Sequence, residues 1–338
     1  MVNLDSSMEQ SSVSEVLKSL GIAVNYIDKK YDYFMTVITR TQGVRPYLLK
    51  ETMLCLMAQE CDDFEWLITA HKVDSDSLQQ IRDMLNQSPV SFNSRVRILS
   101  IEEGNRTQPL NIGFKEARGK YVSILDDDDI VLAHWVSEFL AMSRQNSGKV
   151  LRTMPLWQGC EVLKSPESDQ YASCSVESPV HGTAEYDFWK HFYFNESPIH
   201  CMAFPSNAFQ GWGINFDENL SFTEDWDFLL RMVSVCGICS SAVPTSIYRK
   251  FRNLSNSNTE HNYRERIKCS KLILENINKH RLIVPPGNVF WKNRSRENIL
   301  KLFKTAIYVL RHEGLASFFL RMRSKLKVKG DFAGEKNC

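Results

Sequence analysis

The sequence predicts an α/β fold with a mostly parallel central sheet that is flanked by helices. Short apolar runs alternate with helix-spaced segments between residues 34 and 125, and the connections between them are short. That order is typical of parallel strands joined by crossover helices. The chain has 338 residues, of which 43% are hydrophobic and 24% charged, so it can bury a core and is not disordered throughout.

Four apolar runs in this first part are predicted strands, namely residues 34–38, 64–69, 95–101 and 121–125. Apolar residues three and four positions apart predict one helix in each connection, around 46–57, 78–85 and 109–117. Pro46 and Pro109 suit the first turn of a helix, and Gly119 suits the position after its end.

The sequence after residue 129 is less regular. The pattern predicts a helix that starts near Thr223, another helix at 134–144, and strands at 149–154, 199–204 and 238–248. Ser, Pro and Gly predict a long loop at 158–182, and a polar loop follows at 252–259. Two further helical segments are expected around 262–280 and 295–327, which gives the chain a helical C-terminal extension.

Charge, apolar stretches and cysteine content indicate which partners and which cell compartment the chain has. Forty-one Lys and Arg against 40 Asp and Glu give a net charge of +1, which indicates no nucleic-acid partner. The longest mostly apolar stretch, 232–244, is shorter than the ~20 residues of a membrane-spanning helix, and the polar, acidic start does not resemble a secretory signal. Nine cysteines at irregular spacings predict a reduced, cytoplasmic protein.

The C-terminal end is basic, whereas the rest of the chain is acidic. Residues 289–338 hold 12 Lys and Arg but four Asp and Glu, a net charge of +8, which leaves about −7 for the other residues. Apolar residues recur there at helical spacing, followed by Arg321, Arg323, Lys325, Lys327 and Lys329. Such a segment can lie on an anionic membrane, or it can pack on the body with a solvated basic end. We favour the peripheral membrane contact.

The most informative feature is the acidic run Asp126-Asp-Asp-Asp129, which directly follows the predicted strand 121–125. Ligands of open α/β sheets lie at the carboxyl ends of the strands. Four adjacent carboxylates repel one another unless a cation is bound, and their oxygens suit Mg²⁺ or Mn²⁺ shared with substrate phosphates. The alternative is a solvated acidic turn. Because the run adjoins a buried strand, we favour the metal site.

A second acidic group opens the helix that is predicted to start near Thr223. Glu224, Asp225 and Asp227 crowd the first turn. The helix dipole favours acidic residues there, which is one explanation. The other is a general base whose carboxylate is tuned by burial. The residues alone leave both explanations open.

Four pieces of the sequence, taken in order, resemble the family 2 glycosyltransferases. Residues 36–46 (TVITRTQGVRP) are similar to the first strand and donor loop of that family, and residues 104–113 (GNRTQPLNIG) to the loop before its third helix. Residues 119–129 (GKYVSILDDDD) resemble the strand with the metal-binding DxD motif. Residues 211–218 and 223–227 resemble the acceptor-side segment and its ED base motif.

The resemblance implies a GT-A fold with a nucleotide-sugar-binding half at 31–130 and an acceptor-binding half at 131–260. A polar lead-in at 1–30 precedes these halves, and a helical, basic extension at 261–338 follows them. The resemblance also implies a nucleotide-diphosphate sugar as donor, Mn²⁺ or Mg²⁺ as the metal, and a single displacement that inverts the anomeric centre. The acceptor would be a glycan or a lipid-linked molecule, in cell-surface polysaccharide assembly.

Carried over to this sequence, the resemblance implies roles for single residues. Asp126 and Asp128 fall on the two DxD positions and would hold the metal on the donor diphosphate, with Asp127 between them at the donor. Asp225 falls on the position of the catalytic base, where it would take the proton from the acceptor hydroxyl.

The nucleotide contacts that the resemblance implies come from the first two loops and from Arg106. Thr39 and Arg40 fall where the first loop of the family meets the nucleoside, and Arg106 lies where a cation could approach the nucleotide. The second strand of the family usually ends in an Asp pair, whereas this sequence has Ala70 and His71. His71 is therefore either a contact to the base or an exposed loop histidine.

Glu224 and Trp212 are expected at the acceptor, since they lie beside the base and in the segment before it. Two rival functions are a sugar nucleotidyltransferase and an inactive GT-A-like module that binds a glycan or a partner. The sequence lacks a Gly-rich phosphate loop with a Lys, which weakens the first rival. The presence of Asp126, Asp128 and Asp225 weakens the second.

Overall fold

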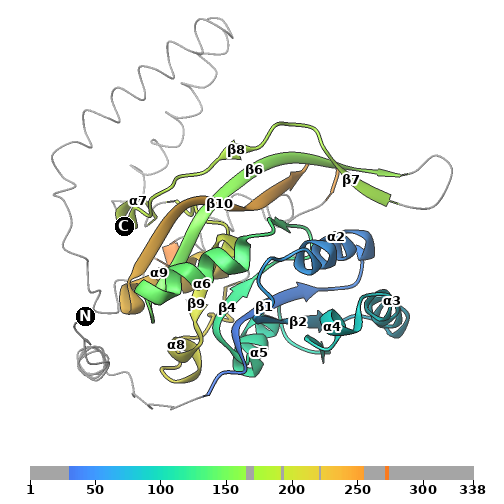
Figure 1. Cartoon of the computed structure of the whole chain (residues 1–338), viewed down its shortest axis with the longest axis horizontal. Coiled ribbons are helices and arrows are strands. Elements are labelled where there is room, and N and C mark those ends of the chain that lie inside the picture. Colours follow the sequence, from blue (N-terminus) through green and yellow to red (C-terminus); the bar gives the residue numbers. More distant parts are fainter. Residues whose placement is uncertain (1–29, 165–170, 192–193, 221, 255–270, 274–338) are drawn as a thin grey trace, which may run out of the picture. The chain divides into compact units, whose positions relative to one another are not determined.

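The computed structural model describes residues 30–164, 171–191, 194–220, 222–254 and 271–273, which form one mixed sheet with helices on both faces (Figure 1). The strands are β1 (Tyr33–Thr41), β2 (Phe64–His71), β3 (Val96–Ile101), β4 (Gly119–Ile124), β5 (Ile130–Val131), β6 (Val150–Lys164), β7 (Tyr171–Ser175), β8 (Val180–His181), β9 (Met202–Pro205) and β10 (Ile238–Phe251). The helices are α2 (Pro46–Met57), α3 (Ser75–Asn86), α4 (Val90–Asn93), α5 (Gln108–Glu116), α6 (Trp135–Gln145), α7 (Phe188–His191), α8 (Ser206–Gln210) and α9 (Glu224–Cys236), with a 3-10 helix η1 (Ile199–Cys201).

The first half of the sheet is parallel and follows the order β3-β2-β1-β4. Val37 at its centre lies opposite Trp66 of β2 and Ser123 of β4. The four predicted strands and the three predicted helices between them are confirmed as β1 to β4 and as α2, α3 and α5. The sequence analysis missed only the short helix α4 in this part of the chain.

Two apolar layers hold the helices against the sheet. Helices α2, α3 and α6 cover one face, where Trp66 and Phe139 are fully buried. Helices α5, α8 and α9 cover the other face, where Phe114 lies within 5.4 Å of the Phe228 ring centre. Burial of apolar area on both faces is the main stabilising contribution in such a fold.

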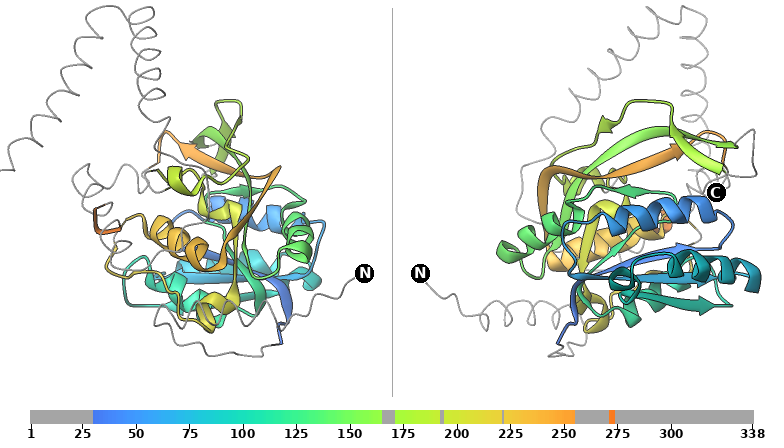
Figure 2. Two further views of the ribbon diagram at one scale, coloured as in Figure 1. Left: turned by 90° about the vertical axis from the view of Figure 1, so that its left-hand side faces the viewer. Right: turned by 45° about the vertical axis from the view of Figure 1, so that its right-hand side comes forward.

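The second half of the sheet continues through β9, β6, β10 and β5, and β6 and β10 run side by side beyond the first half (Figures 1 and 2). The predicted loop at 158–182 is wrong in part, because β6 continues to Lys164 and pairs with β7 and β8. Strands β7 and β8 are largely exposed and lack an apolar pattern, so the sequence does not reveal them. Their main-chain hydrogen bonds to β6 stabilise them.

The other predictions for this half are mostly confirmed. The predicted helices at 134–144 and near Thr223 are α6 and α9, and the predicted strand at 238–248 is β10. The predicted strand at 199–204 is shorter, because its first three residues form η1.

The lead-in at 1–30 and the C-terminal extension with its basic tail lie almost wholly outside the described residues. None of the helices in the described part of the chain is long and apolar enough to cross a membrane.

Candidate active site

Two cavities of about 440 and 360 Å³ open at the carboxyl ends of β1 and β4. We call the cavity of about 440 Å³ the donor-side cavity, after the role expected from the sequence. It lies between the loop after β1, the acidic run 126–129 and the end of β10. We call the cavity of about 360 Å³ the base-side cavity, because it extends to the first turn of α9. Volumes of this size are typical of small-molecule sites, and strand ends are where open α/β sheets bind ligands. The two cavities adjoin, because six residues line both of them: Arg40, Arg106, Asp126, Asp129, Tyr248 and Lys250.

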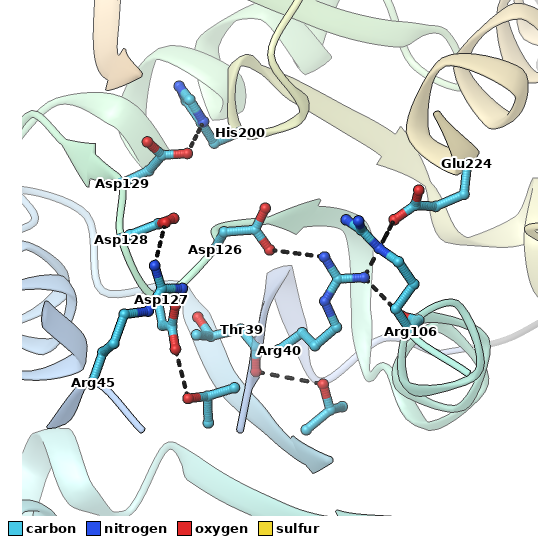
Figure 3. Close-up of polar contacts among 12 residues, drawn as sticks. Thr39, Arg40, Arg45, Arg106, Asp126, Asp127, Asp128, Asp129, His200 and Glu224 are labelled. Atoms are coloured by element: carbon cyan, nitrogen blue, oxygen red, sulfur yellow. Dashed lines mark hydrogen bonds and ion pairs between the residues drawn. The ribbon is translucent and has the colours of Figure 1, made fainter. Parts of the chain in front are cut away.

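The four carboxylates of the acidic run face three partners, with Asp126 toward Arg40, Asp127 and Asp128 toward Arg45, and Asp129 toward His200 (Figure 3). The side chains of Asp126 and Asp128 are 33% and 24% exposed, whereas those of Asp127 and Asp129 are 5% and 4% exposed. The two residues at DxD spacing are therefore the ones whose oxygens are open to a ligand.

The two buried carboxylates of the run are held by protein groups. Thr41 donates a hydrogen bond of 2.6 Å to Asp127 Oδ2, and Arg45 Nη2 lies 2.6 Å from Asp127 Oδ1. Asp129 accepts from the backbone N–H of Arg249 at 2.9 Å, and its Oδ2 lies 2.9 Å from Nδ1 of His200. Asp127, which the sequence analysis expects at the donor, lines the donor-side cavity, and both of its oxygens have protein partners that hold it in the loop.

Charge within the acidic run disfavours ionisation of Asp128. Burial and the neighbouring carboxylates of Asp129 and Asp127 raise the pKa of Asp128 to about 7, although Arg45 lowers it from 2.8 Å. A bound cation would relieve this repulsion.

The oxygens of Asp126 and Asp128 fit Mn²⁺ or Mg²⁺ only as part of a larger set. In the described part of the chain, no group of three His, Cys, Asp or Glu side chains is arranged to hold a metal ion. Mg²⁺ characteristically takes one or two carboxylates and completes its shell with water and substrate phosphates. The residues present therefore fit a metal that binds together with a diphosphate.

Two arginines from separate elements converge on Glu224 (Figure 3). Arg40 at the end of β1 lies 3.3 Å from Glu224 Oε1 through Nη1 and 3.6 Å from Asp126 through Nη2. Arg106, in the loop before α5, lies 2.9 Å from the same Glu224 oxygen and accepts a 2.7 Å hydrogen bond from Arg40 at its carbonyl. Glu224, which the sequence analysis expects at the acceptor, lines the base-side cavity, but it is only 3% exposed and pairs with both of these cations.

Asp225, the next residue of α9, has a different environment. Its Oδ2 accepts a 3.3 Å hydrogen bond from the side-chain amide of Asn195, and its Oδ1 accepts from the backbone N–H of Trp226 at 2.8 Å. Burial, and then the charge of Glu224, raise the pKa of Asp225 to about 6. The carboxylate lines the base-side cavity, so it is an ionisable group that a ligand can reach.

The structure brings His71 into the site and leaves two other expected residues outside it. His71 lines the donor-side cavity, its Nε2 lies 3.2 Å from the carbonyl of Glu103, and burial lowers its pKa. Thr39 is buried and accepts a 2.8 Å hydrogen bond from Trp66 Nε1. Trp212 packs against the core layer around Phe114. Neither Thr39 nor Trp212 lines either cavity.

The sequence analysis missed several lining residues, namely Arg45, Trp157, Asn195, His200, Tyr248 and Lys250. Arg45 stands in the segment that resembles a donor loop, so that resemblance contained a signal for it. The other five come from the irregular second half: Trp157, Tyr248 and Lys250 lie on the paired strands β6 and β10, and Asn195 and His200 lie before and within η1.

Residues 26–192 match glycosyl transferase family 2. An uncharacterized glycosyltransferase of Rickettsia prowazekii is 25% identical over 159 residues, which are 46% of this chain and 48% of the relative. The chain thus spans about half the length of this curated relative.

Two solved structures show the same fold at low sequence identity. S. aureus TarS 1–349 in complex with UDP-GlcNAc has a TM-score of 0.53 and 16% identity, over 73% of this chain and 67% of that chain. The mannosyltransferase PcManGT from Pyrobaculum calidifontis, in complex with GDP-Man and Mn²⁺, has a TM-score of 0.52 and 13% identity, over 97% of this chain and 88% of that chain. By the match over residues 26–192 the chain belongs to the glycosyltransferases of family 2, and the two solved structures show that its fold is GT-A-like, as the sequence predicts.

Proposed function

We propose that the protein is a metal-dependent, inverting glycosyltransferase that moves a sugar from a nucleotide-diphosphate donor to a hydroxyl of a glycan or lipid-linked acceptor. One observation carries the proposal. The adjoining cavities have the open carboxylates Asp126 and Asp128 on one side and Asp225, with its raised pKa, on the other. A group-transfer site needs this combination of a place for a departing diphosphate and a base.

The donor-side cavity suits the nucleotide part of the donor. His71 at the end of β2 offers a ring beside the base, and Arg40 and Arg106 offer cations to the diphosphate. Asp126 and Asp128 would hold Mn²⁺ or Mg²⁺, which when bound stabilises the charge that develops on the leaving diphosphate. The nucleotide sugars in the TarS and PcManGT structures support a donor of this class.

Asp225 supplies the base of the proposed reaction. With a pKa of about 6 it is ionised at neutral pH and is still basic enough to accept a proton. It takes the proton of the acceptor hydroxyl while that oxygen forms a bond to the anomeric carbon. The bond from this carbon to the diphosphate breaks, and the diphosphate leaves with the electron pair. Attack from the side opposite the leaving group inverts the anomeric centre.

The first experiment is a thermal-shift screen of UDP, GDP, TDP and CMP, each with and without Mn²⁺. We expect one nucleoside diphosphate to raise the melting temperature only when Mn²⁺ is present. The matching nucleotide sugar should then be consumed with release of the nucleoside diphosphate, and NMR of the product should show the inverted anomer. Binding without any transfer to glycan acceptors would favour the inactive GT-A-like module, and release of pyrophosphate would favour a nucleotidyltransferase.

The proposed setting is the cytoplasmic face of a membrane, in cell-surface polysaccharide assembly. It rests on the basic, amphipathic C-terminal sequence, which lies outside the described residues. Flotation of the full chain with anionic liposomes tests it. The matched control replaces the five cations between Arg321 and Lys329 with Gln, and this variant should stay in solution. Equal behaviour of both proteins would contradict the membrane contact.

A further inference from the structure

Tyr248 of β10 lies where the two cavities meet. It lines both of them, and four carboxylates from two elements act on its phenol group: Asp126, Asp128, Asp129 and Asp225. The first three belong to the acidic run, and Asp225 belongs to α9. Tyr248 therefore stands between the proposed metal side and the proposed base.

Packing fixes the orientation of the Tyr248 ring. Tyr248 lies opposite Trp157 in the register of β10 and β6, and the two rings meet edge to face with centres 4.9 Å apart. The imidazole of His200 lies almost parallel to it, at 5.9 Å between centres and 16° between planes. His200 is itself held close to Asp129. Aromatic contacts of this kind orient a ring, so the direction of the Tyr248 hydroxyl is set before a ligand binds.

The hydroxyl of Tyr248 has no hydrogen-bond partner among the residues that the structure describes. It is also not fully buried. Tyr121 differs in this respect, since its hydroxyl accepts from Gly148 at 2.9 Å and donates to the carbonyl of Asn146. Burial and the four carboxylates raise the pKa of Tyr248 well above its usual value, so the phenol keeps its proton. A fixed ring with a free hydroxyl donor thus faces the cavity.

We propose that Tyr248 is a sugar-recognition residue, whose hydroxyl donates a hydrogen bond to a hydroxyl of the sugar that is transferred. This inference rests on the proposed function, because it needs a nucleotide sugar in the cavity. The transferred sugar must lie between the diphosphate and the base, and Tyr248 occupies this place. Arg40 and Arg106 line both cavities as well, but their guanidinium groups suit the charged diphosphate, whereas a ring with a polar tip suits a sugar.

The test compares Tyr248→Phe with wild type in two donor pairs, UDP with UDP-GlcNAc and GDP with GDP-mannose, in the presence of Mn²⁺. Calorimetry gives the dissociation constants for the pair that wild type binds. We expect the nucleotide sugar to bind about 3- to 10-fold more weakly to Tyr248→Phe, as for one lost hydrogen bond, and the nucleoside diphosphate to bind equally well. The ring remains, so the packing on Trp157 and His200 is kept.

The matched control is Tyr186→Phe. The Tyr186 hydroxyl also lacks a partner in the described part of the chain, but Tyr186 stacks on His191 and lines neither cavity. This variant should bind both ligands as wild type does.

Three outcomes would overturn the proposal for Tyr248. An equal loss for nucleotide and nucleotide sugar would place the contact on the diphosphate. Unchanged donor binding with a raised KM for the acceptor would place it on the acceptor. A variant that behaves as wild type throughout would remove the contact altogether. These outcomes leave the proposed function intact, whereas a wild-type protein that binds none of UDP, GDP, TDP and CMP in the presence of Mn²⁺ would overturn both.

Discussion

The acidic run after β4 and the acidic first turn of α9 contain similar residues in opposite electrostatic settings. Every carboxylate of the run has a cationic or imidazole partner, with Arg40, Arg45 and His200 at distances from 2.6 to 3.6 Å. In α9, Glu224 takes both nearby guanidinium groups and Asp225 has only neutral donors.

This difference supports two separate roles for the two acidic regions, namely metal and diphosphate binding for the run and proton transfer for Asp225. Carboxylates that are compensated by fixed cations stay in place and can receive a metal and a diphosphate without a large rearrangement. A raised pKa is common to both regions, since that of Asp128 is about 7 even beside Arg45 and that of Asp225 is about 6. Asp225 differs in that its hydrogen-bond partners are neutral and its carboxylate lines the base-side cavity. The ion pairs of Glu224 with Arg40 and Arg106 leave Asp225 without a cation at hydrogen-bond distance, as the base role that we propose for it requires.

The largest effect is expected from a change in the first turn of α9. Asp225→Asn removes the base and keeps the shape, so we expect turnover to fall by about 10²- to 10⁴-fold. Donor binding in the presence of Mn²⁺ should stay within about 2-fold of wild type, because no donor contact is lost. Steady-state kinetics and calorimetry measure the two quantities.

Asp227 of the same helix turn supplies the contrast to Asp225. It is buried and pairs with Arg231 within α9. Asp227→Asn should lower the melting temperature and leave the turnover of the folded protein largely unchanged. If Asp225→Asn keeps a turnover within 10-fold of wild type, the base is another group.

The second largest effect is expected from a change in the acidic run after β4. Asp128→Ala removes an open carboxylate of the run, so the affinity for the nucleoside diphosphate should lose its dependence on Mn²⁺, a fall of about 10²-fold. Titrations with Mn²⁺ and with EDTA measure this dependence. Asp83→Ala, at an exposed position of α3, serves as the control. A Mn²⁺-dependence that survives in Asp128→Ala would move the metal away from the acidic run.

The first half of the fold could be predicted because its signals are local. Each strand from β1 to β4 is an apolar run, each connection has helical spacing, and the acidic run follows β4 directly in the chain. Parallel strands joined by crossovers then bring the ends of β1 and β4 to one edge of the sheet. Arg40 and Asp126 meet there as a result.

The second half depends on contacts between distant segments, and no local pattern contains them. Tyr248 reaches the cavity because β10 pairs with β6, about 90 residues earlier in the chain, in a register with irregularities near Pro244. The indole ring of Trp212 is of the kind that stacks on sugars, but its position beside α8 places it against the core layer instead. Glu224 and Asp225 are adjacent in the sequence, and their different environments come from distant residues, namely Arg40 and Arg106 at Glu224 and Asn195 at Asp225.

A smaller effect is expected from Glu224→Gln. This change leaves Arg40 and Arg106 without their shared carboxylate, so the free energy of unfolding should fall by about 1–3 kcal/mol. The two cations would also lose their fixed positions, and we expect the KM for the donor to rise about 10-fold with little change for the acceptor. Urea unfolding and kinetics with each substrate varied measure these effects. A KM that rises for the acceptor alone would restore the acceptor role expected from the sequence.

The smallest effect sharpens the comparison through pH. The proposed base must be ionised to act. At saturating Mn²⁺, which keeps Asp128 ionised, kcat/KM should therefore be constant at higher pH and should fall as the pH drops through about 6, the raised pKa of Asp225. The amide of Asn195 stabilises the ionised form through a long hydrogen bond of 3.3 Å. Asn195→Ala should therefore raise the apparent pKa further, by about 0.3 to 0.5 units, and reduce kcat/KM about 2-fold below pH 6.

The same argument gives the sign for Asn195→Asp. A second carboxylate beside Asp225 adds to the charges of Glu224 and Asp126 and opposes Arg106, so the acid limb should move to higher pH than in Asn195→Ala. Asn253→Ala is the control, because Asn253 binds the backbone of Val162 in β6 and lines neither cavity. Its pH profile should match wild type. An acid limb that stays in place in both Asn195 variants would show that the titrating group is not Asp225, since the neutral donors at this carboxylate are what distinguish it from the compensated run.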